Sequence, residues 1–107
     1  MPQNPHIFGI TLDGTGVAFT QVVCVNTANN DRQIGSTDVN KQVIFDAANF
    51  SNDYTNGDVV IFENVGSSNG GTTITIDTTQ PGFQEATLTC SAALAISIDL
   101  WGNKDEN

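Results

Sequence analysis

The chain has 107 residues, of which 38% are hydrophobic and 7% aromatic, and its three basic and twelve acidic residues give a formal net charge of −9. This length predicts one domain with one packed core, spanning residues 1–107 with an N-terminal arm at 1–5 and a C-terminal tail at 102–107. So few and scattered basic side chains cannot neutralise a row of phosphates or bind an anionic bilayer, which excludes nucleic acid and membrane surfaces as partners.

The first residues contain neither the basic nor the apolar region of a cleavable signal peptide. No apolar run in the sequence reaches the length of a membrane-spanning helix. We therefore expect a protein that is made in the cytosol and stays there, or that leaves it by a route other than a cleavable leader.

Short runs rich in β-branched and aromatic residues, separated by turn residues, fill the chain, and no stretch predicts a helix. The expected strands, in chain order, are residues 6–12, 17–26, 33–37, 42–47, 59–64, 72–77 and 86–100. Short strands at spacings of about 8–12 residues are typical of a β-sandwich. The sequence therefore predicts an all-β fold, an antiparallel sandwich of seven or eight strands.

Turn residues between these runs predict the connections. We expect a tight turn at residues 13–16, a hairpin turn at 38–41, a polar connection at 49–58, a flexible glycine-rich loop at 66–71 and a turn at 81–82. In the second strand, Val22 and Cys24 compete with Val23 and Val25 for the core-facing positions, a conflict that a bulge would resolve.

The last run has the most regular pattern, because every even-numbered residue from Ala86 to Leu100 is apolar. A period of two predicts an extended strand with one buried face, which no helix could reproduce. At about 3.3 Å per residue this strand would span roughly 50 Å. It must therefore bend near Ser91 to serve two sheets, or extend to pair with another subunit. The residues expected at such an assembly interface are Leu94, Ile96, Ile98, Leu100 and Trp101, with Ile7 and Phe8 from the start of the chain.

Residues 9–18 (Gly-Ile-Thr-Leu-Asp-Gly-Thr-Gly-Val-Ala) and 23–27 (Val-Cys-Val-Asn-Thr) resemble the opening of carboxypeptidase-regulatory-like domains and of collagen-adhesin B-type repeats. The resemblance covers residues 7–64 and includes Asn56-Gly57-Asp58 before the next strand. It implies a prealbumin-like sandwich with immunoglobulin-like architecture and implies no activity. The family's usual Asn-Gly or Asp-Gly between its middle strands is Asn40-Lys41 here, which leaves the type of that turn open.

The two cysteines, Cys24 and Cys90, lie on separate apolar strands. We expect buried, reduced thiols that pack as small hydrophobic groups. A disulfide remains possible if the two face each other across a sandwich, and closing so long a loop would stabilise the fold by about 4 kcal/mol.

The residues that could carry chemistry are few. His6 is the only histidine and has no nucleophile motif to serve, so we expect it at the surface or at a strand edge and expect no enzyme activity. One histidine and two cysteines cannot complete a zinc site without carboxylates, and we expect no cofactor.

An oxygen-rich loop holds the only weak candidates for a metal site. Asn52, Asp53, Asn56 and Asp58 cluster around a glycine, as calcium ligands do. Tyr54 interrupts the EF-hand pattern, and the same residues are also typical of turns in which Asn and Asp cap their own backbone.

With catalysis, nucleic acid and membranes excluded, function rests with binding or assembly. A small, free-standing acidic sandwich is similar in profile to the decoration or cement proteins of tailed viruses. We therefore hypothesise a non-enzymatic virion structural protein, made in the host cytoplasm, that binds a capsid lattice or copies of itself. The alternative is a secreted or cell-surface adhesion or carbohydrate-binding module, which would use the loops at residues 52–58 and 67–71.

Overall fold

The computed structural model describes residues 4–64, 68–79 and 82–92. Its elements are β1 (Ile7–Gly14), β2 (Gln21–Asn26), β3 (Asp31–Ser36), β4 (Gln42–Asp46), the short 3-10 helix η1 (Ala47–Asn49), β5 (Val59–Asn64), β6 (Ser68–Thr75) and β7 (Phe83–Ala92). Within these ranges, no helix has the length and apolar character that crossing a membrane requires. The predicted all-β class is confirmed.

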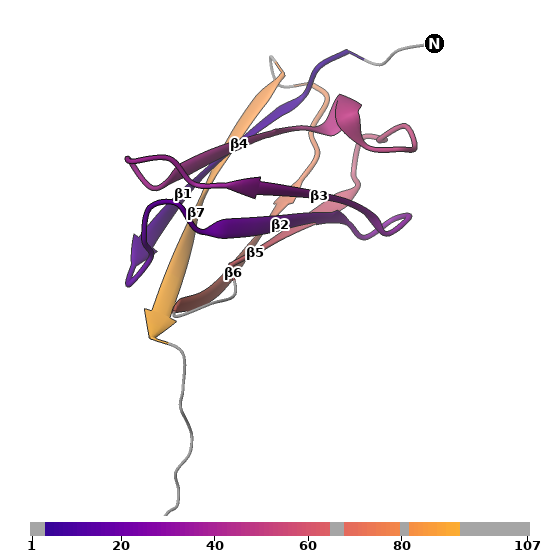
Figure 1. Ribbon diagram of the computed structural model, residues 1–107. Helices are drawn as coiled ribbons and strands as arrows, with labels where there is room; N and C mark the ends of the chain where they lie inside the picture. The colour runs from indigo at the N-terminus through magenta and orange to yellow at the C-terminus, as the bar shows by residue number, and fades with distance from the viewer. Residues whose placement is uncertain (1–3, 65–67, 80–81, 93–107) are drawn as a thin grey trace, which may run out of the picture.

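The seven strands form one mixed sheet in the order β3-β2-β5-β6-β7-β1-β4 (Figure 1). Neighbouring strands are antiparallel, except that β1 and β7 run parallel, with Ile7 opposite Phe83 and Gly14 opposite Cys90. The expected all-antiparallel arrangement is therefore wrong at this pair. The edge strands β3 and β4 approach each other, so that the sheet nearly closes into a barrel.

The barrel has two open seams, one between β3 and β4 and one between β6 and β7. In the described part of the chain, β6 pairs with β7 only through residues 68–70, opposite residues 90–92. Beyond that point β6 stays with β5, and β7 stays with β1. Gly70 makes the short junction possible, because a Cβ on it would lie 2.4 Å from the carbonyl oxygen of Thr89.

The core lies between the two halves of the barrel and is filled by alternate residues of the strands. The Phe62 ring packs at 5.4 Å from Phe8 and at 5.8 Å from Phe45. In β2, Val22 and Cys24 are fully buried, whereas Val23 and Val25 are only partly buried. Val22 and Cys24 therefore take the core-facing positions of this strand. The other buried hydrophobic residues are Ile10, Leu12, Val43, Ala47, Phe50, Tyr54, Val60, Ile74, Ile76, Leu88 and Cys90.

Three local expectations are wrong. Residues 38–41 do form a tight turn, closed by Lys41 N–H donating to Asp38 O (3.0 Å), but β3 pairs with β2 and β4 with β1, so the turn crosses a seam and joins no hairpin. The second strand begins at Gln21, because residues 17–20 belong to the turn that precedes it. The glycine-rich residues 68–71 lie in β6, where Gly70 serves close strand packing and not a loop.

The alternation expected in the last strand is confirmed where the structure describes it. Leu88 and Cys90 are buried, while Glu85, Thr87 and Thr89 are exposed. Residues 93–107 lie outside the described residues, and with them the predicted interface residues Leu94, Ile96, Ile98, Leu100 and Trp101 and the tail at 102–107. Whether the strand bends or extends beyond Ala92 stays a prediction.

Candidate functional site

A shallow hollow of about 80 Å³ lies over Gly9 on the outer face of β4, β1 and β7. Gly9 stands opposite Ile44 on one side and Glu85 on the other. A Cβ on Gly9 would lie 3.0 Å from Phe83 Cζ, so the missing side chain leaves room for the Phe83 ring beside Gly9. The Ile44 side chain is 68% exposed and that of Phe83 is 44% exposed. The lining also includes the polar residues Thr11, Gln42 and Glu85, so the surface is mixed and not purely apolar.

The strand pattern explains why these residues share one face. Successive side chains of a strand point to opposite faces, so Val43 and Phe45 enter the core and Ile44 must point outward. Ile7, two residues before Gly9, lies on the same face and is half-buried.

Phe8 does not belong to this surface. Its side chain is fully buried against Phe62, so its expected place in an interface is wrong, whereas Ile7 lies where a partner could reach it.

Phe19, in the connection between β1 and β2, is the most exposed large hydrophobic side chain among the described residues, at 75%. Its backbone has a φ of 59°, in the left-handed region that bulky residues rarely adopt. Its N–H donates to Thr37 O (3.0 Å), and the Thr37 hydroxyl accepts from Thr20 N (3.0 Å) and donates to Val17 O (3.1 Å). Thr37 is buried and thereby fixes the loop that displays the Phe19 ring.

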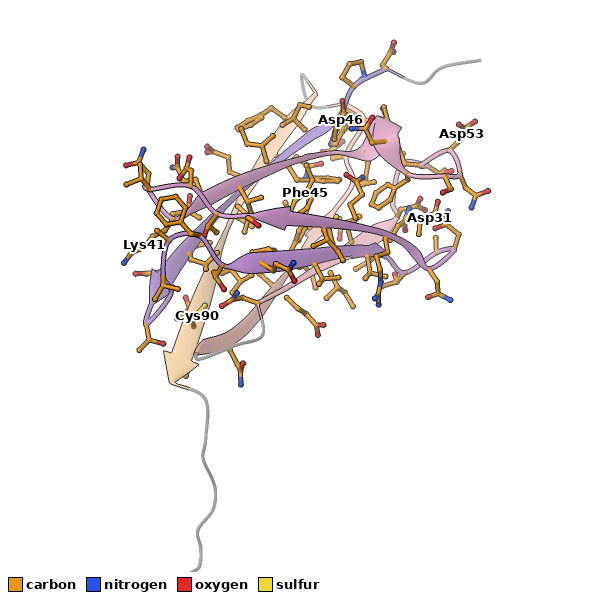
Figure 2. All side chains as sticks on the ribbon, in the orientation of Figure 1. Asp31, Lys41, Phe45, Asp46, Asp53 and Cys90 are labelled. Carbon is orange, nitrogen blue, oxygen red and sulfur yellow. The ribbon has the colours of Figure 1, made fainter. Side chains whose placement is uncertain are left out.

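The hollow lies along the middle of β1, where its lining includes Gly9, Ile10 and Thr11, and the Phe19 loop departs from the end of β1 at Gly14. Leu12 N–H donates to Lys41 O (2.9 Å), which places the turn at residues 38–41 beside the end of β1 from which the Phe19 loop departs. Figure 2 shows Lys41 at that end and Asp31 and Asp53 at the other. From Gly9 to Gly14 the strand advances about 17 Å. Phe19 does not line the hollow, and its ring is 75% exposed.

His6 is buried, with 2% of its surface exposed, so of the two expected positions, at the surface or at a strand edge, the surface one is wrong. Its Nε2 lies 2.6 Å from Gln84 Oε1, an oxygen that also accepts from Asp77 N (3.0 Å). Because the Gln84 amide nitrogen donates to Thr75 O, its orientation is fixed and His6 Nε2 must be the donor. The ring also packs on Phe8 and Tyr54. This arrangement connects the residue before β1 to β7.

The chain before β1 is anchored by Tyr54. The Tyr54 hydroxyl donates to Asn4 O (2.6 Å). Burial raises the pKa of this phenol above its ordinary value, and the negative charge of Asp46 raises the pKa further. Residue 4, which was expected to belong to a terminal arm, is thus held against the body of the protein.

Three of the four calcium candidates take part in hydrogen bonds within the protein. Asn56 Oδ1 and Asp58 Oδ2 accept hydrogen bonds from neighbouring backbone N–H groups, and Asn52 donates from its side chain to Asp31 (3.0 Å). Asp53 is exposed. Across residues 4–64, 68–79 and 82–92, no group of three or more His, Cys, Asp or Glu side chains could hold a metal ion. The loop has the internal capping expected of an Asn- and Asp-rich turn.

Both cysteines are free thiols and buried. Burial raises the pKa of Cys24 to about 12, and it also raises the pKa of the Cys90 thiol. The Cys90 Sγ lies 3.5 Å from Asn64 Oδ1. The two side chains thus pack as small core groups, and the structure contains no disulfide between them.

Sequence reasoning missed the hollow and the Phe19 loop. The hollow could have been anticipated in part from the alternation around Ile44, because this pattern puts a large aliphatic residue on the face opposite Val43 and Phe45. The left-handed backbone of Phe19 has no such signal in the sequence. Comparison of the chain with protein-family models, with curated proteins and with solved structures finds no match.

Proposed function

We propose that the protein is a non-enzymatic structural protein of a virion, a decoration or cement protein that docks on the outside of a capsid. The observation that carries the proposal is the exposure of three large apolar side chains, Phe19, Val39 and Ile44, on a small acidic all-β body. Large apolar side chains that are exposed in the free protein can be buried when it associates with a partner. The protein then acts by burying surface against a lattice of capsid subunits, against copies of itself, or both.

The fold that we propose for this role is a variant of the immunoglobulin-like, prealbumin-like sandwich. Two features support the assignment: the turn and strand residues of positions 9–18 and 23–27, and the way β6 and β7 separate after residue 70 so that the sheet divides into two halves. Such domains serve many hosts as rigid display bodies, so the assignment agrees with a docking role and does not itself specify one.

The end of the chain is the second docking element. Leu94, Ile96 and Ile98 have the same even-numbered parity as Leu88 and Cys90, which are buried. An extended segment with that pattern can add to a neighbouring sheet by main-chain hydrogen bonds and fill it with its apolar face. We propose that residues 94–101 make this contact with the neighbouring subunit.

The proposal is tested by sedimentation with capsid shells. If the reading frames that flank the gene encode capsid, portal and terminase proteins, shells assembled from that capsid protein should carry the purified protein into the pellet. An Ile96→Asp variant should remain in the supernatant, whereas Ser97→Asp, on the opposite parity, should pellet as the unmodified protein does. Absence of binding to shells, or saturable binding to sugars on a glycan array with or without calcium, would contradict the proposal.

A further inference from the structure

We propose that two copies of this protein pack face to face through the outer surface of β3, β2 and β5, so that Arg32 of each copy pairs with Glu63 of the other. This inference deepens the proposed function, because it names a second copy of the chain as a partner, and it rests on the protein working by association. The surface is separate from the hollow over Gly9, which lies on β4, β1 and β7.

The alternation of the strands determines which side chains form this surface. In β2 and β5 the even-numbered residues are buried, so the odd-numbered residues point outward. In β3 the odd-numbered residues face inward: a Cβ on Gly35 would lie 2.9 Å from Val43 Cγ2, and the even-numbered neighbours are exposed. The pairing register places the outward residues in two rows. The first row is Arg32, Val25 and Ile61, and the second row is Ile34, Val23 and Glu63.

The centre of this surface is apolar. Side chains directly opposite each other on paired antiparallel strands have Cβ atoms about 5 Å apart. Val23, Val25, Ile34 and Ile61 therefore form one continuous cluster. Ile34 is 57% exposed, and the other three residues are partly exposed. Packing against a second copy removes this apolar area from water, which favours association.

The surface carries few charges for so acidic a protein. The strands β3, β2, β5 and β6 contain three charged residues, Asp31, Arg32 and Glu63, although the chain has twelve acidic residues and a net charge of −9. Asp31 has the inward parity, and its carboxylate accepts from Asn52 N (2.7 Å) and Asn52 Nδ2 (3.0 Å). The outward face of these strands therefore holds one positive and one negative charge. Copies repel each other less through such a face than through an acidic one.

Arg32 and Glu63 lie at diagonally opposite corners of the apolar cluster. The strand β2 lies between them, and they are offset by two residues along the strands, so their Cα atoms are about 12 Å apart. In the part of the chain that the structure describes, neither side chain has a hydrogen-bond or ion-pair partner. Both charges are thus available to a partner molecule.

This diagonal placement makes the surface complementary to itself. A two-fold axis that runs parallel to the sheet and perpendicular to the line from Arg32 to Glu63 places each of these residues over the other one in the second copy. Both ion pairs then form at once, and the two apolar clusters meet between them. The strands of the two sheets cross at a steep angle, as in orthogonal sheet packing. Such a contact uses the same patch on both copies, so it closes as a dimer.

The size of the surface determines how strong the dimer is. Four strands about 4.8 Å apart, each with three same-face residues about 7 Å apart, cover about 300 Å². A stable interface of standard size buries about 800 Å² on each partner. We therefore expect a dimer that dissociates on dilution, in which the two charge pairs determine the orientation of the copies.

Sedimentation equilibrium of the full-length protein tests the inference. The average mass should rise above that of the monomer between about 0.01 and 1 mM protein. Arg32→Glu places like charges in contact at both ends of the interface and should weaken association at least about tenfold. Glu63→Arg should weaken it as much, although this substitution lowers the net charge from −9 to −7 and so reduces the general repulsion between copies. Ile34→Asp, at the apolar centre, should also weaken it.

Mixing the two charge variants distinguishes a specific pairing from a general effect of charge. Each variant repels its own copies, but one copy of Arg32→Glu against one copy of Glu63→Arg restores two opposite-charge pairs. The mixture should therefore dimerise about as well as the unmodified protein. At constant total concentration, the fraction of dimer should be highest when the two variants are present in equal amounts.

Lys41→Glu and Asp53→Arg are the matched controls, because they make the same two changes of net charge at exposed positions outside this surface. Both should associate about as the unmodified protein does. A protein that stays monomeric up to about 1 mM, unchanged association of Arg32→Glu, stronger association of Glu63→Arg, or a mixture without dimers would each overturn the inference.

Sedimentation with capsid shells separates this inference from the proposed function. Failure of the protein to bind shells, with dimerisation and the charge-variant results as expected, would contradict the capsid proposal alone. Loss of shell binding by Arg32→Glu, with self-association unchanged, would assign this face to the capsid and overturn the inference.

Discussion

Gln33 and Gln84 hold the two open seams of the barrel in the same way. Gln33 Nε2 donates to Asp46 O at the end of β4 (2.9 Å), and Gln84 Nε2 donates to Thr75 O at the end of β6 (2.9 Å). In each case one side-chain amide spans strands whose backbones do not pair there. Side-chain hydrogen bonds therefore connect the strands at both seams, where backbone hydrogen bonding between them ends.

Replacing Gln84 should destabilise the fold more than replacing Gln33. Gln84→Ala removes the partner of His6 Nε2, Asp77 N and Thr75 O together, whereas Gln33→Ala removes one such bond. Because His6 is buried, its Nε2–H group would then have neither the Gln84 acceptor nor access to water. We expect a loss of about 1–3 kcal/mol for Gln84→Ala and of about 1 kcal/mol for Gln33→Ala, measured by urea unfolding.

Gln42→Ala is the control for these variants. The Gln42 side chain is exposed, and its amide lies 3.5 Å from Thr11 Oγ1, at the limit of a hydrogen bond. We expect its free energy of unfolding to change by less than about 0.5 kcal/mol. Equal effects of Gln84→Ala and Gln42→Ala would show that the seam does not depend on this amide.

Two adjacent glycines should respond oppositely to the same substitution. A Cβ on Gly70 would lie 2.4 Å from Thr89 O and 2.7 Å from Leu88 Cδ2, whereas the nearest atom to a Cβ on Gly71 is 3.5 Å away. Neither residue has a positive φ, so the difference is one of space. Gly70→Ala should destabilise the fold by about 1–3 kcal/mol.

Gly71→Ala is the matched variant, and it should be neutral or stabilising by up to about 1 kcal/mol, because alanine restricts the unfolded chain. Both values are obtained from thermal or urea unfolding of the full-length protein. A stable Gly70→Ala variant would mean that the junction of β6 with β7 is wider than described.

The sequence predicts the strands better than their partners. Alternation gives β5 at its observed bounds and the buried face of β7, because both depend on local side-chain pattern. The parallel pairing of β1 with β7 joins residues about seventy-five positions apart, and no local signal encodes it. The hairpin expected at residues 38–41 fails for the same reason, since a turn sequence determines that the chain turns but not which strands then pair.

The candidate site likewise contains residues that local sequence pattern predicts and residues that it does not. Ile7 and Ile44 are placed on the outer face by strand period, which a sequence contains. The hollow also needs Phe83 from a distant strand beside Gly9, and the display of Phe19 depends on the buried hydroxyl of Thr37. His6 shows the converse: a polar residue near the terminus is buried because Gln84, far along the chain, supplies its partner.

Calcium should leave the stability of the fold unchanged. A ligand that binds only the folded state raises the unfolding temperature. Asp58 Oδ2 already accepts from Asn26 Nδ2 (3.0 Å) and Thr55 N (2.9 Å), so a cation at this oxygen would compete with these bonds. We expect thermal unfolding curves with added calcium, magnesium or chelator to coincide. A rise specific to calcium that is absent from an Asp58→Asn variant would show that the loop does hold the ion.

Alkaline pH should destabilise the protein through Cys24. Burial raises the pKa of this thiol from an ordinary value of 9.0 to about 12. Between those two pH values the unfolded chain loses the proton and the folded chain keeps it. The free energy of unfolding therefore falls as the pH rises, by up to about 1.4 kcal/mol per pH unit for one thiol. Below pH 9 both states are protonated, and this contribution to stability is fully present.

The measurement is the slope of the free energy of unfolding against pH, obtained from urea unfolding between about pH 8 and pH 10. Cys24→Ala should reduce the slope, and combining it with Cys90→Ala should reduce it further, because burial also raises the pKa of Cys90. The pKa of Tyr54 is also raised, from an ordinary value of 10.0, so ionisation of this phenol likewise lowers the free energy of unfolding, at higher pH. Neither cysteine substitution removes this contribution of Tyr54. A Cys24→Ala variant with the original slope would show that Cys24 ionises as readily in the folded protein as in the unfolded chain.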